Sequence, residues 1–173
     1  QYPEIYNKVK NAVKSGNWEV QGGMWVEADC NLISGESMVR QLLHGKNFFK
    51  DEFDIVVDNL WLPDVFGYSA ALPQILKRAG VNYFLTQKLS WSQFNDFPHQ
   101  TFNWRGIDGT EILTHFPPEN TYNSELDTEF LLPAQKGFKE KDRLNEFISL
   151  FGVGDGGGGP KPENIELGRR MSS

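Results

Sequence analysis

The chain has 173 residues, 39% of them hydrophobic, which is enough for one globular domain with a sizeable core. Its 23 acidic and 17 basic side chains give a formal charge of −6, which argues against a nucleic-acid partner, because phosphate binding requires a basic surface. Cys30 is the only cysteine, so an intrachain disulfide and a cysteine zinc cluster are excluded. No membrane-spanning run, signal-peptide pattern or Asn-x-Ser/Thr acceptor occurs, so we expect no membrane partner and an intracellular location.

The first third of the chain predicts two helices joined by a short strand. Apolar residues recur at helical spacing over residues 2–13 and predict the first helix. Residues 22–27 are typical of a short strand that runs into a loop. A second helix is predicted around residues 38–43, with a capping residue among 34–37 and an end near Gly45.

The remainder of the chain alternates short apolar strands with helices. The predicted strands are 55–57, 60–62, 81–86, 101–104, 111–116 and 147–151. The predicted helices are 72–79, 139–146 and 163–171, the last of which looks like an element cut off as it begins to pack. This alternation predicts an α/β fold with a mainly parallel sheet, and we expect the chain to be one piece of a larger domain.

Two predicted strands are followed by an acidic residue and then by glycine. These residues are Asp64, after strand 60–62, and Asp155, after strand 147–151. Carboxylates at the ends of different strands of one parallel sheet can converge on one cleft, and glycosidic bond cleavage needs two carboxyl groups that flank the bond. The structural alternative is that one or both simply cap a helix or turn, where Asp is common.

The glycine run at 154–159 could be mistaken for a phosphate-binding loop. It lacks the Gly-Lys-Ser/Thr ending of a P-loop and does not match the dinucleotide fingerprint, so nucleotide binding is not predicted. Consecutive glycines instead allow close approach of the backbone to a ligand, or form a mobile loop.

The remaining candidate residues have both structural and functional interpretations. His115 ends a predicted strand, which suits a site as well as a core position, whereas the other two histidines lie near a helix end and in a loop. No pair of histidines has conventional zinc spacing. Glu27 and Asp29 follow the strand at 22–27, where they could bond sugar hydroxyls or belong to a solvated loop. The five tryptophans could fill the core or stack on sugar faces.

A set of motifs in a fixed order carries a resemblance to a known family. The motifs are GGMWVEADCN (22–31), SGES (34–37), WLPDVFGYS (61–69), LPQIL (72–76), TQKLSW (86–91), FNWRGIDG (102–109), LTHFPP (113–118) and GVGDGGGGP (152–160). Together they closely resemble the α-mannosidases of glycoside hydrolase family 38, in the branch that includes cytosolic, vacuolar and bacterial enzymes. The resemblance covers nearly the whole chain.

The resemblance implies a retaining α-mannosidase that removes terminal α-linked mannose from oligosaccharides and uses a divalent metal, usually zinc. It implies that residues 1–173 are part of an N-terminal (β/α) barrel-like catalytic domain, truncated at both ends, with further β domains downstream. Asp64 matches the family's nucleophile, which is also a metal ligand, and Asp155 falls where relatives carry the general acid/base. The candidate substrate-binding residues are Trp25, Glu27, Asp29, Trp91, His115, Tyr122 and Asn123. The implied location is cytoplasmic or vacuolar.

The sequence departs from the family pattern at the metal site. Relatives bind the metal through a His-x-Asp motif upstream and a further histidine downstream, and neither occurs here, so Asp64 is the only implied ligand within the chain. A zinc site needs at least three protein ligands. We therefore expect the isolated chain to bind zinc weakly and to hydrolyse mannosides little.

Two alternatives compete with the mannosidase. A metal-dependent carbohydrate deacetylase on a related barrel would need an aspartate with two nearby histidines, which the chain lacks. A non-catalytic carbohydrate-binding or interaction module would use the tryptophans and leave Asp64 incidental.

Overall fold

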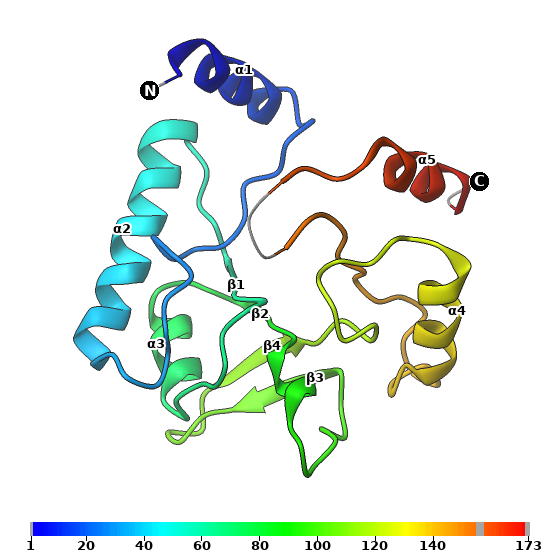
Figure 1. Cartoon of the computed structure of the whole chain (residues 1–173). Coiled ribbons are helices and arrows are strands. Elements are labelled where there is room, and N and C mark those ends of the chain that lie inside the picture. Colours follow the sequence, from blue (N-terminus) through cyan, green and yellow to red (C-terminus); the bar gives the residue numbers. More distant parts are fainter. Residues whose placement is uncertain (1, 155–157, 172–173) are drawn as a thin grey trace.

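A computed structural model describes residues 2–154 and 158–171, which form a mixed α/β domain around one small sheet (Figure 1). The helices are α1 (Pro3–Lys14), α2 (Gly35–Phe53), α3 (Leu72–Arg78), a 3-10 turn η1 (Lys88–Trp91), α4 (Thr128–Gly137) and α5 (Pro162–Met171). The strands are β1 (Asn59–Trp61), β2 (Tyr83–Leu85), β3 (Thr101–Arg105) and β4 (Glu111–His115). In the part of the chain that the structure describes, no helix is both long and apolar enough to cross a membrane.

The sheet is mainly parallel, as the sequence predicts. Its strand order is β1-β2-β4-β3, in which β1, β2 and β4 are parallel and β3 returns antiparallel to β4. The register aligns Trp61, Leu85 and His115, the last residues of the three parallel strands. The loops that follow these strands therefore leave the sheet at one edge.

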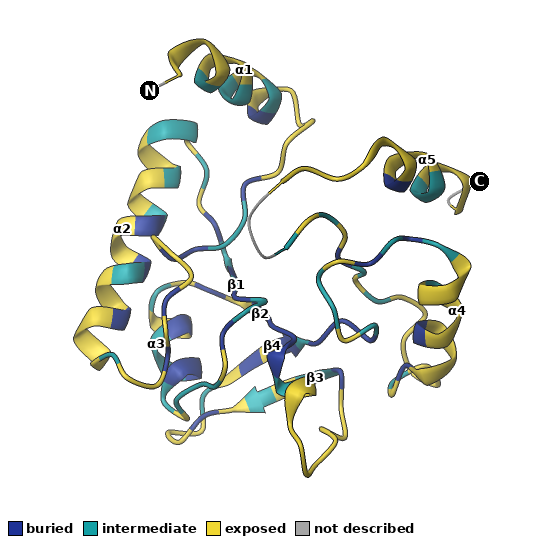
Figure 2. Ribbon diagram, in the orientation of Figure 1, coloured by how far each residue is buried: buried dark blue, intermediate teal, exposed yellow. Residues whose placement is uncertain are grey.

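The hydrophobic core lies on one face of the sheet, under α2 and α3 (Figures 1 and 2). Leu60, Phe84 and Ile112 point to this face because side chains alternate along a strand. They pack with buried side chains of the two helices, which are Met38, Leu42, Leu72 and Leu76. Burial of these aliphatic groups supplies the main driving force for this part of the fold.

The opposite face of the sheet is only partly covered. A hollow of about 830 Å³ lies there, with Trp61, Leu85 and Leu113 among the lining side chains. The helices α4 and α5 lie beyond this side of the sheet (Figure 1). The described residues form a four-stranded sheet and no closed barrel.

Local sequence signals explain where the correctly predicted helices begin. The Ser34 hydroxyl accepts a hydrogen bond from the Ser37 amide and caps α2, and proline occupies the first turn of both α1 and α3. The predictions for α1, α3 and α5, and for β1 to β4, are confirmed to within a few residues.

Other predicted elements are wrong. Residues 22–27 and 55–57 form no strand, and 147–151 contributes only an isolated bridge between Ser124 and Phe151. The predicted helix at 139–146 consists of turns, whereas the actual helix α4 begins earlier, where the Asp127 side chain accepts a bond from the Phe130 amide. Helix α4 forms even though Pro133 lies inside it and has no amide hydrogen to donate.

Helix α2 does not end near Gly45 but continues to Phe53, because Gly45 is a packing residue. A Cβ placed on Gly45 would lie 2.4 Å from the Gly23 carbonyl oxygen and 2.4 Å from the Met24 carbonyl carbon. The glycine therefore lets the 23–24 backbone lie directly against the helix.

We expect Gly45→Ala to destabilise the domain by about 1–3 kcal/mol, although alanine is the better helix former, because the added methyl overpacks a backbone contact. Urea unfolding would measure the loss as a lower midpoint at an unchanged slope. Gly35→Ala in the same helix is the matched control, since a Cβ there meets nothing within 4 Å. Equal effects of the two substitutions would contradict this account.

Candidate active site

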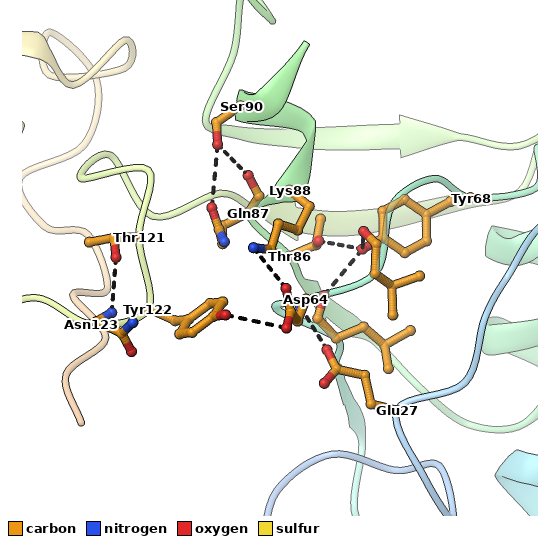
Figure 3. A network of polar contacts seen from close by, with 12 residues as sticks. Glu27, Asp64, Tyr68, Thr86, Gln87, Lys88, Ser90, Thr121, Tyr122 and Asn123 are labelled. Carbon is orange, nitrogen blue, oxygen red and sulfur yellow. Dashed lines mark hydrogen bonds and ion pairs between the residues drawn. The ribbon is translucent and has the colours of Figure 1, made fainter. Parts of the chain in front are cut away.

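Three side chains meet at the edge of the sheet where the parallel strands end. Asp64 follows β1, Lys88 follows β2, and Tyr122 lies in the segment after β4. Figure 3 shows all three converging, with Lys88 and Tyr122 directed at the Asp64 carboxylate. This is the place where open parallel sheets bind their ligands.

The two oxygens of the Asp64 carboxylate have different partners. The Lys88 ammonium lies 2.7 Å from Oδ1, and the Tyr122 hydroxyl donates to Oδ2 at 3.2 Å. The Asp64 side chain is 38% exposed, whereas that of Lys88 is only 5% exposed. The carboxylate is thus open to a ligand on one side, while the cation beside it is buried.

Aromatic rings enclose the Lys88 ammonium. Its nitrogen lies 3.8 Å from the centre of the Trp91 ring, 5.1 Å from that of Phe66 and 5.0 Å from that of Tyr122. Rings at these distances stabilise a cation through their negative faces. Phe66 and Trp91 pack edge to face, and both remain largely exposed, so an apolar surface borders the carboxylate.

A second group of contacts fixes the loop that carries Asp64. The Asp64 amide donates to Glu27 Oε1 at 2.6 Å, which attaches the loop to the segment before α2 (Figure 3). The Tyr68 hydroxyl bonds the Leu62 and Val65 carbonyl oxygens and also Thr86 on the neighbouring chain segment. Burial raises the pKa of Tyr68, so the hydroxyl keeps its proton and acts as a structural donor.

Some predicted substrate-binding residues lie at this cluster. Trp91 and Tyr122 touch it directly, and Glu27 contacts it through the Asp64 amide. Asn123 follows Tyr122, and a Cβ placed on Gly154 would meet both residues within 3 Å. The beginning of the glycine run therefore lies beside the Asp64 cluster. Asp155 itself lies outside the described residues.

Trp25 and Asp29 have other partners. The Trp25 ring packs edge to face on Phe48 of α2. Asp29 Oδ1 accepts bonds from the Asn31 and Leu32 amides, which close a turn and hold the pKa of Asp29 below its usual value. The structural interpretation, a residue that stabilises a loop, accounts for this geometry, and sugar contact at either position stays a prediction.

His115 is held by the protein at both ring nitrogens. The Ile148 amide donates to Nε2 at 3.2 Å, so Nε2 carries no proton, and Nδ1 bonds the Thr101 hydroxyl at 2.8 Å. Desolvation by burial lowers the pKa of His115, although the negative charge of Glu140 opposes the shift. This geometry makes His115 a neutral clamp between β4, β3 and the 147–151 segment. Its predicted contact with substrate is not tested.

The described residues do not make a zinc site by themselves. Among residues 2–154 and 158–171 there is no group of three His, Cys, Asp or Glu side chains that could hold a metal. Burial raises the pKa of Cys30 to about 11, so its thiol is not available as a thiolate ligand at neutral pH. An ionised carboxylate has about four lone-pair positions, so Asp64 can still offer one ligand bond beside Lys88 and Tyr122.

Sequence reasoning missed Lys88 and Phe66 as members of the site. Lys88 belongs to the TQKLSW motif and lies three residues beyond the end of β2, just as Asp64 lies three residues beyond the end of β1. The rule that singled out Asp64 would have found Lys88 if it had been applied to cations as well as to carboxylates.

Comparison with known proteins identifies the family. The whole chain, residues 1–173, matches the profile described as the N-terminal domain of glycosyl hydrolases family 38. The chain belongs to this family. It is 51% identical to Alpha-mannosidase G of Dictyostelium discoideum over 95% of its length, and 47% identical to human Alpha-mannosidase 2C1 over 100%. It is also 44% identical to the Alpha-mannosidase of Saccharomyces cerevisiae over 99% of its length.

The chain spans only 15–17% of the length of these curated family 38 relatives. Among solved structures, an alpha-mannosidase from Enterococcus faecalis V583 superimposes with a TM-score of 0.68, covering 98% of this chain and 20% of that one. At 22% sequence identity, this similarity supports the fold alone.

The clamp at His115 predicts a pH dependence of stability. The unfolded chain takes up the histidine proton near the ordinary pKa of about 6.5, whereas the folded protein takes it up only at lower pH. The contribution of His115 is therefore complete above that pH and is lost as the pH falls from about 7 toward the lowered folded value. Urea unfolding between pH 8 and pH 5 should show this loss.

His115→Gln should flatten this part of the profile, although it lowers stability overall. His44→Gln, at an exposed position on α2, is the control and should leave the slope unchanged. The clamp is refuted if wild type and His115→Gln lose stability in parallel as the pH falls.

Proposed function

We propose that the domain belongs to a retaining α-mannosidase, which removes terminal α-linked mannose from oligosaccharides, and that it supplies the nucleophile Asp64. The observation that carries the proposal is the position of Asp64. It lies at the carboxyl edge of a parallel sheet, is partly open to solvent, and is bordered by exposed aromatic rings. Identities of 44–51% to curated α-mannosidases support the reaction class.

Retaining hydrolysis assigns a specific step to Asp64. A carboxylate oxygen attacks the anomeric carbon as the bond to the leaving-group oxygen breaks, and the sugar becomes an ester of Asp64. Water then attacks the same carbon and releases the carboxylate. The apolar faces of Phe66 and Trp91 are suited to pack against the sugar ring, and Glu27 keeps the Asp64 backbone in place.

The second carboxyl group in the proposal is Asp155, as general acid and then base. Its support is the family motif and the position of its neighbour, since Gly154 lies against Tyr122, which bonds Asp64. A general acid protonates the leaving-group oxygen in the first step and removes a proton from the attacking water in the second.

A zinc ion would bind Asp64 together with at least two further ligands from sequence outside the described residues. When bound, such a metal supplies Lewis-acid stabilisation of sugar oxygens. The same proposal includes a barrel-like catalytic domain, completed by other parts of the full-length protein and followed by β domains. A cytoplasmic or vacuolar location is part of the same proposal and rests on the motifs that the chain shares with that branch of the family.

Asp64→Asn in the full-length protein should lower kcat for an aryl α-mannoside by about three orders of magnitude or more, because an amide oxygen is a poor nucleophile. Proton NMR of the wild-type reaction should show that the first sugar released keeps the α configuration. Retained turnover in Asp64→Asn, or a β sugar as first product, would exclude the proposed role. If the wild-type protein shows no turnover, and Asp64→Asn binds sugar as well as the wild type does, a non-catalytic binding module is favoured.

The role of Asp155 predicts a dependence on the leaving group. Asp155→Ala should slow glycosyl transfer to the enzyme most for alkyl mannosides, whose leaving oxygen needs a proton, and least for mannosides of acidic phenols. Pre-steady-state release of the aglycone from both substrates would measure the difference. Asp142→Ala is the control, since this exposed carboxylate lies in the turns after α4. An equal loss on both substrates would contradict the assignment.

A further inference from the structure

Lys88 pairs directly with Asp64, but the reaction described above gives it no role. We propose that Lys88 is the positioning residue of the nucleophile: its ammonium holds Asp64 Oδ1 and so presents Oδ2 to the anomeric carbon. This inference rests on the proposed mannosidase function. It is carried by the geometry of the ion pair and by the burial of Lys88.

The ion pair between Lys88 and Asp64 differs from the exposed ion pairs of the domain because its lysine side chain is buried. The Lys88 side chain is 5% exposed, compared with 53% for Lys50, which pairs with Asp54 on α2. An exposed lysine can exchange its carboxylate partner for water at little cost, but a buried ammonium that lost its partner would be left desolvated. The Lys88 contact is therefore persistent.

The surrounding rings also restrict the direction of the ammonium. The ammonium lies 3.8, 5.1 and 5.0 Å from the ring centres of Trp91, Phe66 and Tyr122. Within this aromatic enclosure it forms its ion pair with Asp64. The enclosure itself is anchored to the Asp64 loop, because Phe66 lies two residues beyond Asp64. The loop that carries Asp64 therefore also supplies Phe66, one of the rings that enclose the Lys88 ammonium.

The two contacts on the carboxylate are unequal, and this difference selects the attacking oxygen. The bond at Oδ1 is short and joins two charged groups, whereas the bond at Oδ2 is longer and comes from the neutral Tyr122 hydroxyl. A substrate displaces the weaker partner more easily. Oδ2 then forms the bond to the anomeric carbon, and Oδ1 becomes the ester carbonyl oxygen, still bonded to Lys88.

The contact between Lys88 and Asp64 Oδ1 also assists the second step, in which water hydrolyses the ester. When water attacks the anomeric carbon, the bond between that carbon and Oδ2 breaks and its electron pair returns to the carboxylate. The Lys88 ammonium then faces the negative charge that reappears. The charge on Lys88 stays constant through both steps, so its role is orientation and charge stabilisation and involves no proton transfer.

Lys88→Met in the full-length enzyme tests the proposal, because methionine fills much of the same space without the charge. We expect kcat for an aryl α-mannoside to fall about 10²-fold with KM changed less than about threefold, as for a misplaced reactive group. Lys88→Arg, which keeps the charge, should recover most of kcat. Lys50→Met, which removes the exposed pair, should match wild type.

A double-mutant cycle separates positioning from general damage to the fold. In an Asp64→Asn background, Lys88→Met should cause no further loss of the residual rate, because the group that it positions is already absent. A kcat within a few-fold of wild type for Lys88→Met would overturn the inference. So would a loss confined to KM, an equal loss in Lys88→Arg, or additive losses in the double mutant.

NMR of the 173-residue chain tests the contact without activity and without relying on a folded Lys88→Met variant. The ring of Trp91 should shift the Lys88 Hε signals upfield, and Asp64→Asn should move these signals while those of Lys50 stay in place. Lys88 signals at ordinary lysine positions, or unaffected by Asp64→Asn, would overturn the inference. A wild-type full-length enzyme without mannosidase turnover would overturn the proposed function and this inference together, whereas an active enzyme indifferent to Lys88 would overturn only the latter.

Discussion

The parallel pairing of β1, β2 and β4 is the constraint on which the candidate site depends. With Trp61, Leu85 and His115 in register, three chain segments that are distant in sequence leave the sheet at one edge. The carboxylate after β1 then meets the ammonium after β2, and Tyr122 approaches from beyond β4. A slip by one residue in any of these strands would also turn its side chains to the other face, so core packing and site geometry enforce the same register.

The sequence predicted those parts of the structure that local chemistry determines. The α2 cap at Ser34, the prolines that open α1 and α3, and the apolar strands on either side of α3 are local signals, and each was recognisable without tertiary information. Asp64 could be singled out for a related reason, since a carboxylate after an apolar strand has a predictable place in an α/β sheet. Asp155 stays a prediction, because it lies outside the described residues.

The parts that sequence reasoning missed depend on contacts between distant segments. Gly45 has the local meaning of a helix stop, and only the backbone of residues 23–24 lying against α2 explains why a glycine occurs within the helix. His115 was equally compatible with a site and a core, and the contact that distinguishes a clamp comes from Ile148, 33 residues away. The position of Lys88 after a strand is a local signal for the sheet edge, but no local feature marks the side chain as buried. Its environment is created by Phe66, Trp91 and Tyr122 together.

The close contact at Gly45 links the middle of the long helix α2 to the candidate site at the sheet edge. The segment pressed against that glycine continues directly to Glu27, whose carboxylate accepts the amide hydrogen of Asp64. Gln41, one turn earlier in α2, holds the same segment through the Trp25 and Val26 amides. Substitutions at Gln41 or Gly45, on the inner side of α2, are therefore expected to disturb the backbone segment that holds Asp64 in place.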